Sequence, residues 1–290
     1  MWSLNLTSNT HVGEINTLEV LGETDDSFVL DGGNKGEIVL SKTRAPESCA
    51  TGQKLGVFVY PENDGQLVAT CNTPKAEAGQ CALLKVVNVT SAGAFLDWGI
   101  QKDLLVPLSQ QITPMEEGKS YVVYVLIDPQ GRIIGATKLH RYLDERAKNM
   151  APGDEVDLLI VGKSELGYKA VINGTHLGLL FKSDVFQEFR PGDKTIGFIK
   201  TVREDRKIDL GLRRRGKKSR EELTERILAH LAAADGCSPL TDYSAPEDIY
   251  KQYGVSKGDY KKALGALYKD RKIDVSKTKI VLLTSSRKAD

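Results

Sequence analysis

The sequence predicts a mostly β protein, in which three tandem five-stranded barrels are followed by a smaller C-terminal α+β domain. The first observation behind this prediction is a frame of glycine pairs that recurs three times along the chain. Each pair is separated by 39 residues: Gly13 and Gly52, Gly79 and Gly118, Gly153 and Gly192. The second observation is a change after Leu212, where short strand-like runs give way to helical periodicity. At 290 residues the chain can form several compact units, each with its own core.

The glycine frame also suggests where the units begin and end. The second and third units align without a gap at a shift of 74 residues, which places GQCALLKVV over GDEVDLLIV. We therefore expect a degenerate, acidic barrel (unit one) over residues 1–74, barrels over residues 75–148 (unit two) and 149–212 (unit three), a basic linker over residues 213–218, and the C-terminal domain over residues 219–290.

Unit two shows its strands most clearly, as short runs rich in Val, Ile, Leu and aromatic residues with turn residues between them. Asp128 to Gly131 reads DPQG and supplies a tight turn before the last strand. Five short strands in one such unit are typical of the OB-fold, a partly open barrel that often binds oligonucleotides. The expected strands are residues 81–90, 94–98, 103–107, 120–127 and 132–137.

Unit two resembles the ribosomal-protein S-one type of OB-fold. The resemblance rests on the run from Thr90 to Asp97, which reads TSAGAFLD, on LVPLS from Leu105 to Ser109, and on Glu117-Gly118-Lys119. Unit three is similar but more divergent, with GYKAV from Gly167. Unit one keeps the glycine frame and little else of the motif.

The C-terminal domain reads as three helices and two short strands. A capping box of Ser219 and Glu222 is expected to begin the first helix, and residues 245–253 form the second. Ser256 and Asp259 are expected to cap the third. Two strands follow, over residues 272–275 and 279–283. This pattern resembles a winged-helix domain.

Three S-one-like units followed by a winged helix resemble the conserved virulence factor B family of bacterial RNA-binding proteins. The resemblance spans nearly the whole chain. It implies that the protein binds RNA and is linked to virulence gene expression.

Composition and motifs argue against an enzyme. The four cysteines form no CxxC pair, the four histidines have no partner at metal-ligand spacing, and the nucleotide-binding and hydrolase motifs are absent from the sequence. We therefore expect a non-enzymatic protein without a metal or cofactor, with reduced thiols. No apolar run is long enough for a membrane span and no leader pattern opens the chain, so we expect a cytoplasmic protein that makes no membrane contact.

Charge is distributed unevenly along the chain, although the formal net charge is only +1. Residues 1–78 carry 5 basic and 11 acidic side chains, whereas residues 213–290 carry 18 basic and 11 acidic ones. This gradient favours a polyanionic partner at the C-terminal end; a solubilising basic tail is the alternative.

Single-stranded nucleic acid is held by aromatic rings that stack on bases and by cations that follow the phosphates. In the resembled S-one family, aromatic residues on the second and third strands and a basic residue on the fifth line the RNA face. Phe95 stands at the second-strand position of unit two, with Trp98 as a further stacking candidate and Arg132 at the start of the last strand. Pro107 replaces the histidine usual in that family.

In unit three, Arg206 aligns with Arg132 of unit two and Lys169 takes the Phe95 position, so Tyr168 and Phe181 must supply the aromatic surface. Each aromatic residue could instead lie in the barrel core. Cations gather around the last hairpin and continue into the linker: Lys200, Arg203, Arg206 and Lys207, then Arg213, Arg214 and Arg215. Unit one has Gln66 at the arginine position and an acidic surface, so we predict that it does not bind RNA.

The expected third helix of the winged helix carries Lys257, Lys261 and Lys262 but no Arg, Asn or Gln. Lysines contact phosphates without reading base sequence, so nonspecific backbone contact is the better interpretation. The leading hypothesis is single-stranded RNA binding by units two and three with the winged helix. Two alternatives stay open: a protein-interaction adaptor that uses acidic unit one, and a DNA-binding regulator that acts through the winged helix.

Overall fold

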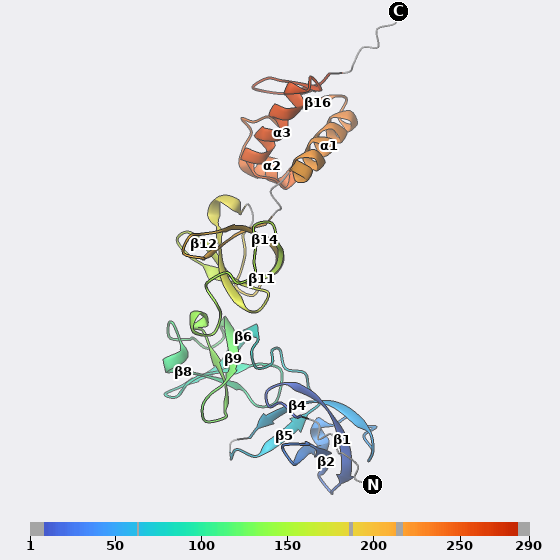
Figure 1. The fold of residues 1–290 in the computed structure, drawn as a ribbon, viewed down its shortest axis with the longest axis vertical. Coiled ribbons are helices and arrows are strands. Elements are labelled where there is room, and N and C mark those ends of the chain that lie inside the picture. Colours follow the sequence, from blue (N-terminus) through green and yellow to red (C-terminus); the bar gives the residue numbers. More distant parts are fainter. Residues whose placement is uncertain (1–8, 63, 186–187, 213–216, 284–290) are drawn as a thin grey trace, which may run out of the picture.

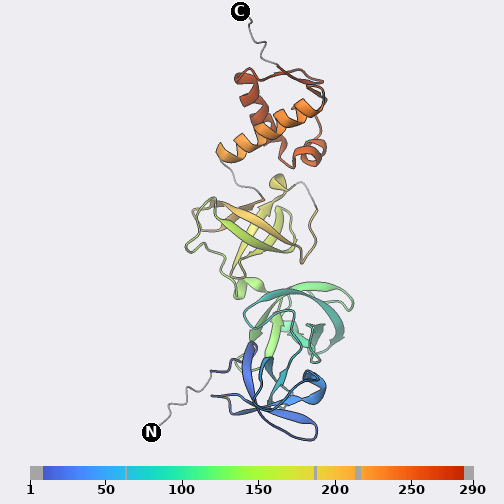
Figure 2. The ribbon, with the colours of Figure 1, turned by 90° about the vertical axis from the view of Figure 1, so that its right-hand side faces the viewer.

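The computed structural model describes residues 9–62, 64–185, 188–212 and 217–283. Three closed five-stranded barrels and a C-terminal helical domain follow one another along the long axis of the molecule (Figures 1 and 2). Barrel one and the C-terminal domain lie at opposite ends of this axis. The predicted fold class, mostly β with tandem OB-type barrels and a C-terminal winged helix, is confirmed.

Barrel one has the strand order β1-β2-β3-β5-β4. In β1 the alternation of Leu18 and Val20 with exposed residues directs two apolar side chains into the barrel. The core is completed by Leu30, Ile38 and Leu40 from the next hairpin. Its strands are β1 (Ile15–Glu23), β2 (Ser27–Asp31), β3 (Glu37–Ser41), β4 (Lys54–Pro61) and β5 (Leu67–Thr70).

Barrels two and three repeat the same strand arrangement. Gly93 and Gly167 occupy equivalent positions, and a Cβ atom at either would clash with a carbonyl oxygen of the facing strand, that of Val106 or Leu180. Glycine therefore allows the second and third strands to approach closely in both barrels. The strands are β6 (Cys81–Thr90), β7 (Gly93–Asp97), β8 (Leu104–Pro107), β9 (Ser120–Ile127) and β10 (Ile133–Ala136), then β11 (Glu155–Lys163), β12 (Gly167–Ile172), β13 (His176–Phe181), β14 (Lys194–Val202) and β15 (Ile208–Gly211).

The C-terminal domain contains three helices and a three-stranded sheet of order β16-β18-β17. Ser256 caps α3 as expected, because its hydroxyl accepts from the Asp259 backbone amide at 3.0 Å. The first helix begins at Lys217, so Ser219 lies inside it and not at the predicted cap. The short strand β16 was not expected from the sequence. The elements are α1 (Lys217–Ala233), β16 (Cys237–Ser238), α2 (Pro246–Tyr253), α3 (Lys257–Lys269), β17 (Ile273–Val275) and β18 (Ile280–Leu282).

Neighbouring barrels share apolar cores. Phe58 and Tyr60 of barrel one pack in one cluster with Trp98 and Ile100 of barrel two. Between barrels two and three, a second shared cluster contains Val122, Leu139, Leu143 and Val171. In the described parts of the chain, no helix has the length and apolar character needed to cross a bilayer.

Candidate nucleic-acid interface

The outer surface of barrel three brings an aromatic ring and cations together, and we call Lys169, Phe181, Lys200 and Arg203 the barrel-three face. Phe181 lies at the end of β13 opposite Gly167, where the facing strand has no side chain. The Lys200 Nζ lies 5.9 Å from the centroid of the Phe181 ring, and the Arg203 Cζ lies 5.5 Å from it. These are cation–π distances.

Two carboxylates pair with two of the three cations of the barrel-three face. Lys200 pairs with Asp184, and the Arg203 guanidinium donates to Asp209 at 2.8 Å. This hydrogen bond raises the pKa of Arg203 above its ordinary value. Lys169 is exposed on the same side of β12, because its neighbours Tyr168 and Ala170 point into the barrel. On the barrel-three face, the half-buried Phe181 ring therefore lies beside two cations that ion pairs hold in place.

Tyr168 is a correction to the predicted aromatic surface. Its side chain is only 5% exposed and lies in the core of barrel three, where the ring meets Phe189 edge-on at 5.6 Å. The alternation along β12 places Lys169 outward and Tyr168 inward, so one of the two had to be buried. Of the two predicted rings in this barrel, Phe181 alone is partly exposed.

Arg206 and Lys207 lie in the turn between β14 and β15, and both are exposed. The Arg206 guanidinium donates to the Ala147 carbonyl oxygen at 2.8 Å, and the Arg206 carbonyl accepts from the Ala147 amide. Arg206 also has a positive φ of 66°. It therefore anchors the segment that joins barrels two and three, a structural contact that the sequence alignment did not indicate.

In barrel two, Phe95 and Trp98 differ in exposure. Phe95 is half-buried on the outside of β7, opposite Asn88 and Leu105, while Leu96 points inward as expected. Trp98 is only 2% exposed: its ring meets Phe58 of barrel one edge-on at 5.4 Å, and its indole N–H donates to the Lys102 carbonyl. The prediction of Trp98 as a stacking residue is corrected, because barrel one covers it.

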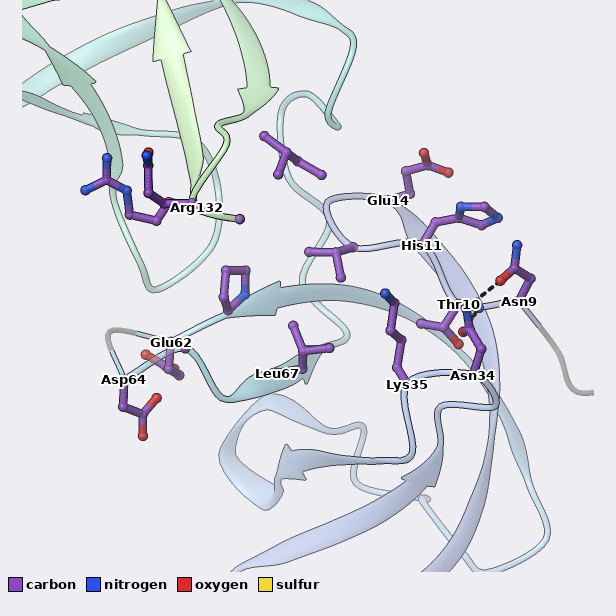
Figure 3. A pocket seen from close by; sticks show the side chains of 16 residues that line it. Asn9, Thr10, His11, Glu14, Asn34, Lys35, Glu62, Asp64, Leu67 and Arg132 are labelled. Atoms are coloured by element: carbon purple, nitrogen blue, oxygen red, sulfur yellow. Dashed lines mark hydrogen bonds between the residues drawn. The ribbon is translucent and has the colours of Figure 1, made fainter.

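Arg132 lies at a cavity of about 890 Å³ between barrels one and two, across from His11, Asn34 and Lys35 (Figure 3). Its guanidinium pairs with Asp128 at 2.7 Å. Burial of Asp128 opposes ionisation, but hydrogen bonds from Arg132 outweigh it and hold the pKa of that carboxyl below its ordinary value. Arg132 thus has a carboxylate partner at the junction of the two barrels.

The three predicted lysines of α3 differ in surroundings. The Lys257 Nζ donates to the Ser244 carbonyl at 2.9 Å and is half-buried, whereas Lys261 and Lys262 are exposed. Lys261 lies 3.6 Å from Asp242. Tyr268, which is not among the predicted site residues, is 57% exposed and lies seven residues after Lys261, and therefore on the same face of α3. The seven-residue spacing between Lys261 and Tyr268 is the pattern in the sequence that could have indicated it.

The predicted linker cations Arg213, Arg214 and Arg215 lie outside the described residues. Within the described ranges, no group of three or more His, Cys, Asp and Glu side chains is placed to hold a metal ion.

Two domain families match the chain. Residues 225–282 match the CvfB-like winged helix domain, and residues 12–72 match the S1 domain. The S1 match falls on barrel one, the unit that keeps the least of the S-one sequence motif. OB-fold barrels and winged helices are both used to bind nucleic acids. These matches support nucleic acid binding as the general activity.

Relatives match the chain over nearly its full length. Conserved virulence factor B of Staphylococcus saprophyticus is 26% identical over 93% of this chain and 94% of its own. The protein YitL of Bacillus subtilis, described as uncharacterized, is 26% identical over 90% of both chains. A solved structure from Streptococcus pneumoniae, described as a multidomain protein with nucleic acid binding domains, aligns at 25% identity with a TM-score of 0.39. It covers 94% of this chain and 98% of its own.

Proposed function

This chain resembles the conserved virulence factor B family in its winged helix and over 93% of its length, and on that premise we propose that it binds single-stranded RNA. In this proposal the protein is a cytoplasmic, non-enzymatic binder that acts on gene expression after transcription. Barrels two and three and the winged helix hold the RNA.

The observation that carries the proposal is the barrel-three face. A base that leaves its stack needs a flat ring to lie against, and alanine substitution of such rings costs roughly 1–3 kcal/mol per base. Phe181 offers one ring, with Lys200 and Arg203 within 5.9 Å of its centroid. In this proposal Lys200 and Arg203 also contact the phosphates on either side of the stacked base.

The other domains contribute unequally in this proposal. Phe95 adds a second stacking position on barrel two, and Lys261 and Lys262 add phosphate contacts on α3. Barrel one is acidic and does not hold RNA; it covers Trp98 and supports barrel two. Several weak contacts on one chain raise the overall affinity through effective concentration.

The proposal is tested by titrating labelled single-stranded RNA into the full-length chain and its variants. Phe181→Leu keeps apolar volume but removes the π face, and we expect it to weaken RNA binding about tenfold. Arg203→Ala is expected to weaken it by a similar factor. The matched control is Arg190→Ala, which removes an exposed arginine of barrel three outside the barrel-three face.

Single-stranded DNA and duplex DNA are titrated in parallel. Unchanged RNA affinity in both barrel-three variants would contradict the proposal. Tight, sequence-selective binding of duplex DNA would favour a regulator that acts through α3, and failure to bind any of the three nucleic acids would favour a protein-interaction adaptor.

A further inference from the structure

The segment that connects barrels two and three is fixed in place. The Asp144 amide donates to the Thr175 carbonyl at 3.0 Å, and the Leu177 amide donates to the Asp144 carbonyl at 2.8 Å. Leu139 and Leu143 of this connector are buried in the core that the two barrels share. Because its backbone and its apolar side chains are both held, the connector presents His140, Arg141 and Tyr142 from a fixed backbone.

These side chains help to line a pocket of about 480 Å³ between the two barrels, which we call the junction pocket. Tyr142 contributes a ring that stacks on Tyr124, with centroids 5.2 Å apart and planes within 6°. Its hydroxyl donates to the Gln110 side chain at 2.8 Å, which fixes the ring. His140 and Arg141 are exposed beside it.

The opposite wall of the junction pocket is the turn of the β12–β13 hairpin. It contributes Gly174, whose φ of 71° suits a residue without a side chain, and Thr175. The pocket therefore combines a fixed aromatic ring and the Arg141 cation with the Asp144 carboxylate, which pairs with Lys148 at 2.7 Å. Proteins that hold single strands use aromatic rings for bases and cations for phosphates.

The junction pocket and the barrel-three face lie at the two ends of one hairpin. Outward positions of β12 and β13 pair as Lys169 with Leu179 and as Gly167 with Phe181. From Thr175 to Phe181 the strand advances about 20 Å at roughly 3.3 Å per residue. The two positions are therefore about 20 Å apart along one hairpin, and the outward pair between them, Val171 with Leu177, packs in the core shared with barrel two.

We propose that the junction pocket is a second RNA subsite, in which Arg141 binds a phosphate and Tyr142 lies against a base of the same strand that Phe181 holds. This inference rests on the proposed function. It adds that the connector between barrels two and three is part of the binding surface, and that the protein favours RNAs long enough to reach from Phe181 to Tyr142.

The test compares two oligouridylates on the full-length protein, one of about six nucleotides and one of about twenty, since OB-fold sites span roughly 4–16 nucleotides. Arg141→Ala is expected to lower the affinity for the long RNA roughly tenfold, equivalent to about 1.4 kcal/mol. The short RNA, held by the barrel-three face alone, is expected to bind as before. Arg146→Ala is the matched control, because it removes an exposed arginine of the same connector that does not line the pocket.

Three outcomes separate this inference from the proposed function. If Arg141→Ala leaves the long RNA unaffected while Phe181→Leu still weakens both RNAs, the junction pocket is not a subsite and the proposed function stands. If Arg146→Ala lowers the affinity for the long RNA as much as Arg141→Ala does, the loss reflects only the change in net charge, and the inference fails. If neither Phe181→Leu nor Arg203→Ala changes the affinity for either RNA, the proposed function itself fails.

A crosslink provides a readout that does not depend on affinity. A long RNA with scattered 4-thiouridine, irradiated with the wild-type protein, is expected to crosslink to a peptide containing His140 to Tyr142 as well as to one containing Phe181. A crosslink to the Phe181 peptide alone would overturn the inference.

Discussion

At the scale of single residues, burial decides which aromatic side chains can meet a ligand. Phe95 and Trp98 are three residues apart on the same edge of barrel two, but only Phe95 keeps part of its ring in solvent. Trp98 is covered by Phe58 of the preceding barrel, and its indole N–H donates to the Lys102 backbone carbonyl. Trp98 therefore contributes to stability, whereas Phe95 is available for the binding that we propose.

This difference gives a paired prediction. Trp98→Ala is expected to lower the free energy of unfolding by about 3–5 kcal/mol, because it leaves a large cavity between two barrels. Phe95→Ala is expected to cost clearly less stability but to weaken RNA binding. Denaturant unfolding and RNA titration of both variants measure the two effects. Equal losses of stability in the two variants would contradict the assignment.

A second residue-scale prediction concerns Cys81, which packs against the core shared by barrels two and three. Burial raises the pKa of the Cys81 thiol to about 12. The thiolate is the reactive form, so at about pH 8 iodoacetamide should modify exposed Cys237 and spare Cys81 in the native protein. Mass spectrometry of tryptic peptides measures both sites, and rapid labelling of Cys81 would show that the junction opens.

The same raised pKa sets a direction for stability. The folded state holds the Cys81 proton more tightly than the unfolded chain, whose thiol has a pKa of about 8.5. The contribution of the protonated Cys81 thiol to the free energy of unfolding is therefore complete below about pH 8.5, and it is lost as the pH rises toward 12. The free energies of unfolding of the wild type and of Cys81→Ala, measured across this pH range, should converge as the pH increases.

At the scale of elements, the close approach of the second and third strands positions the barrel-three face. Gly167→Ala would force a methyl group against the Leu180 carbonyl and push β12 away from β13, next to Phe181. We expect a loss of about 1–3 kcal/mol in the free energy of unfolding, together with weaker RNA binding. The matched control is Gly162→Ala in the same barrel, where an added Cβ meets no atom within 4 Å. If Gly167→Ala left both the free energy of unfolding and the RNA affinity unchanged, Gly167 would not position the barrel-three face.

Much of the element-scale structure could be predicted from the sequence, because local rules determine it. The glycine frame and the strand runs predicted the barrels, and the Ser256 cap predicted the start of α3. Trp98 and Tyr168 were predicted wrongly as surface rings: alternation shows that neighbours point to opposite sides, but not which side a core or a second barrel covers. Sequence also could not reveal that Arg206 anchors Ala147, since this contact joins residues 59 positions apart.

At the scale of the whole molecule, the excess of positive charge lies in residues 213–290, and RNA binding should depend strongly on salt. Each phosphate contact with a single strand contributes about −0.7 to the slope of log K against log salt. Replacing both Lys261 and Lys262 with alanine should reduce the magnitude of the slope by about 1.4. The same double change at Lys35 and Lys54 of barrel one is the matched control. Equal effects of the two pairs would indicate that net charge alone governs binding.

The shared core around Trp98 also bears on how the chain is made. Synthesis proceeds from the N-terminus and domains fold largely as units, so barrel one can be complete before Trp98 leaves the ribosome. Phe58 and Tyr60 are then already in place to cover the indole when barrel two closes. A circularly permuted chain with barrel one last would leave this apolar surface uncovered during translation. We therefore expect barrel one to assist the folding of barrel two by covering Trp98 as barrel two forms.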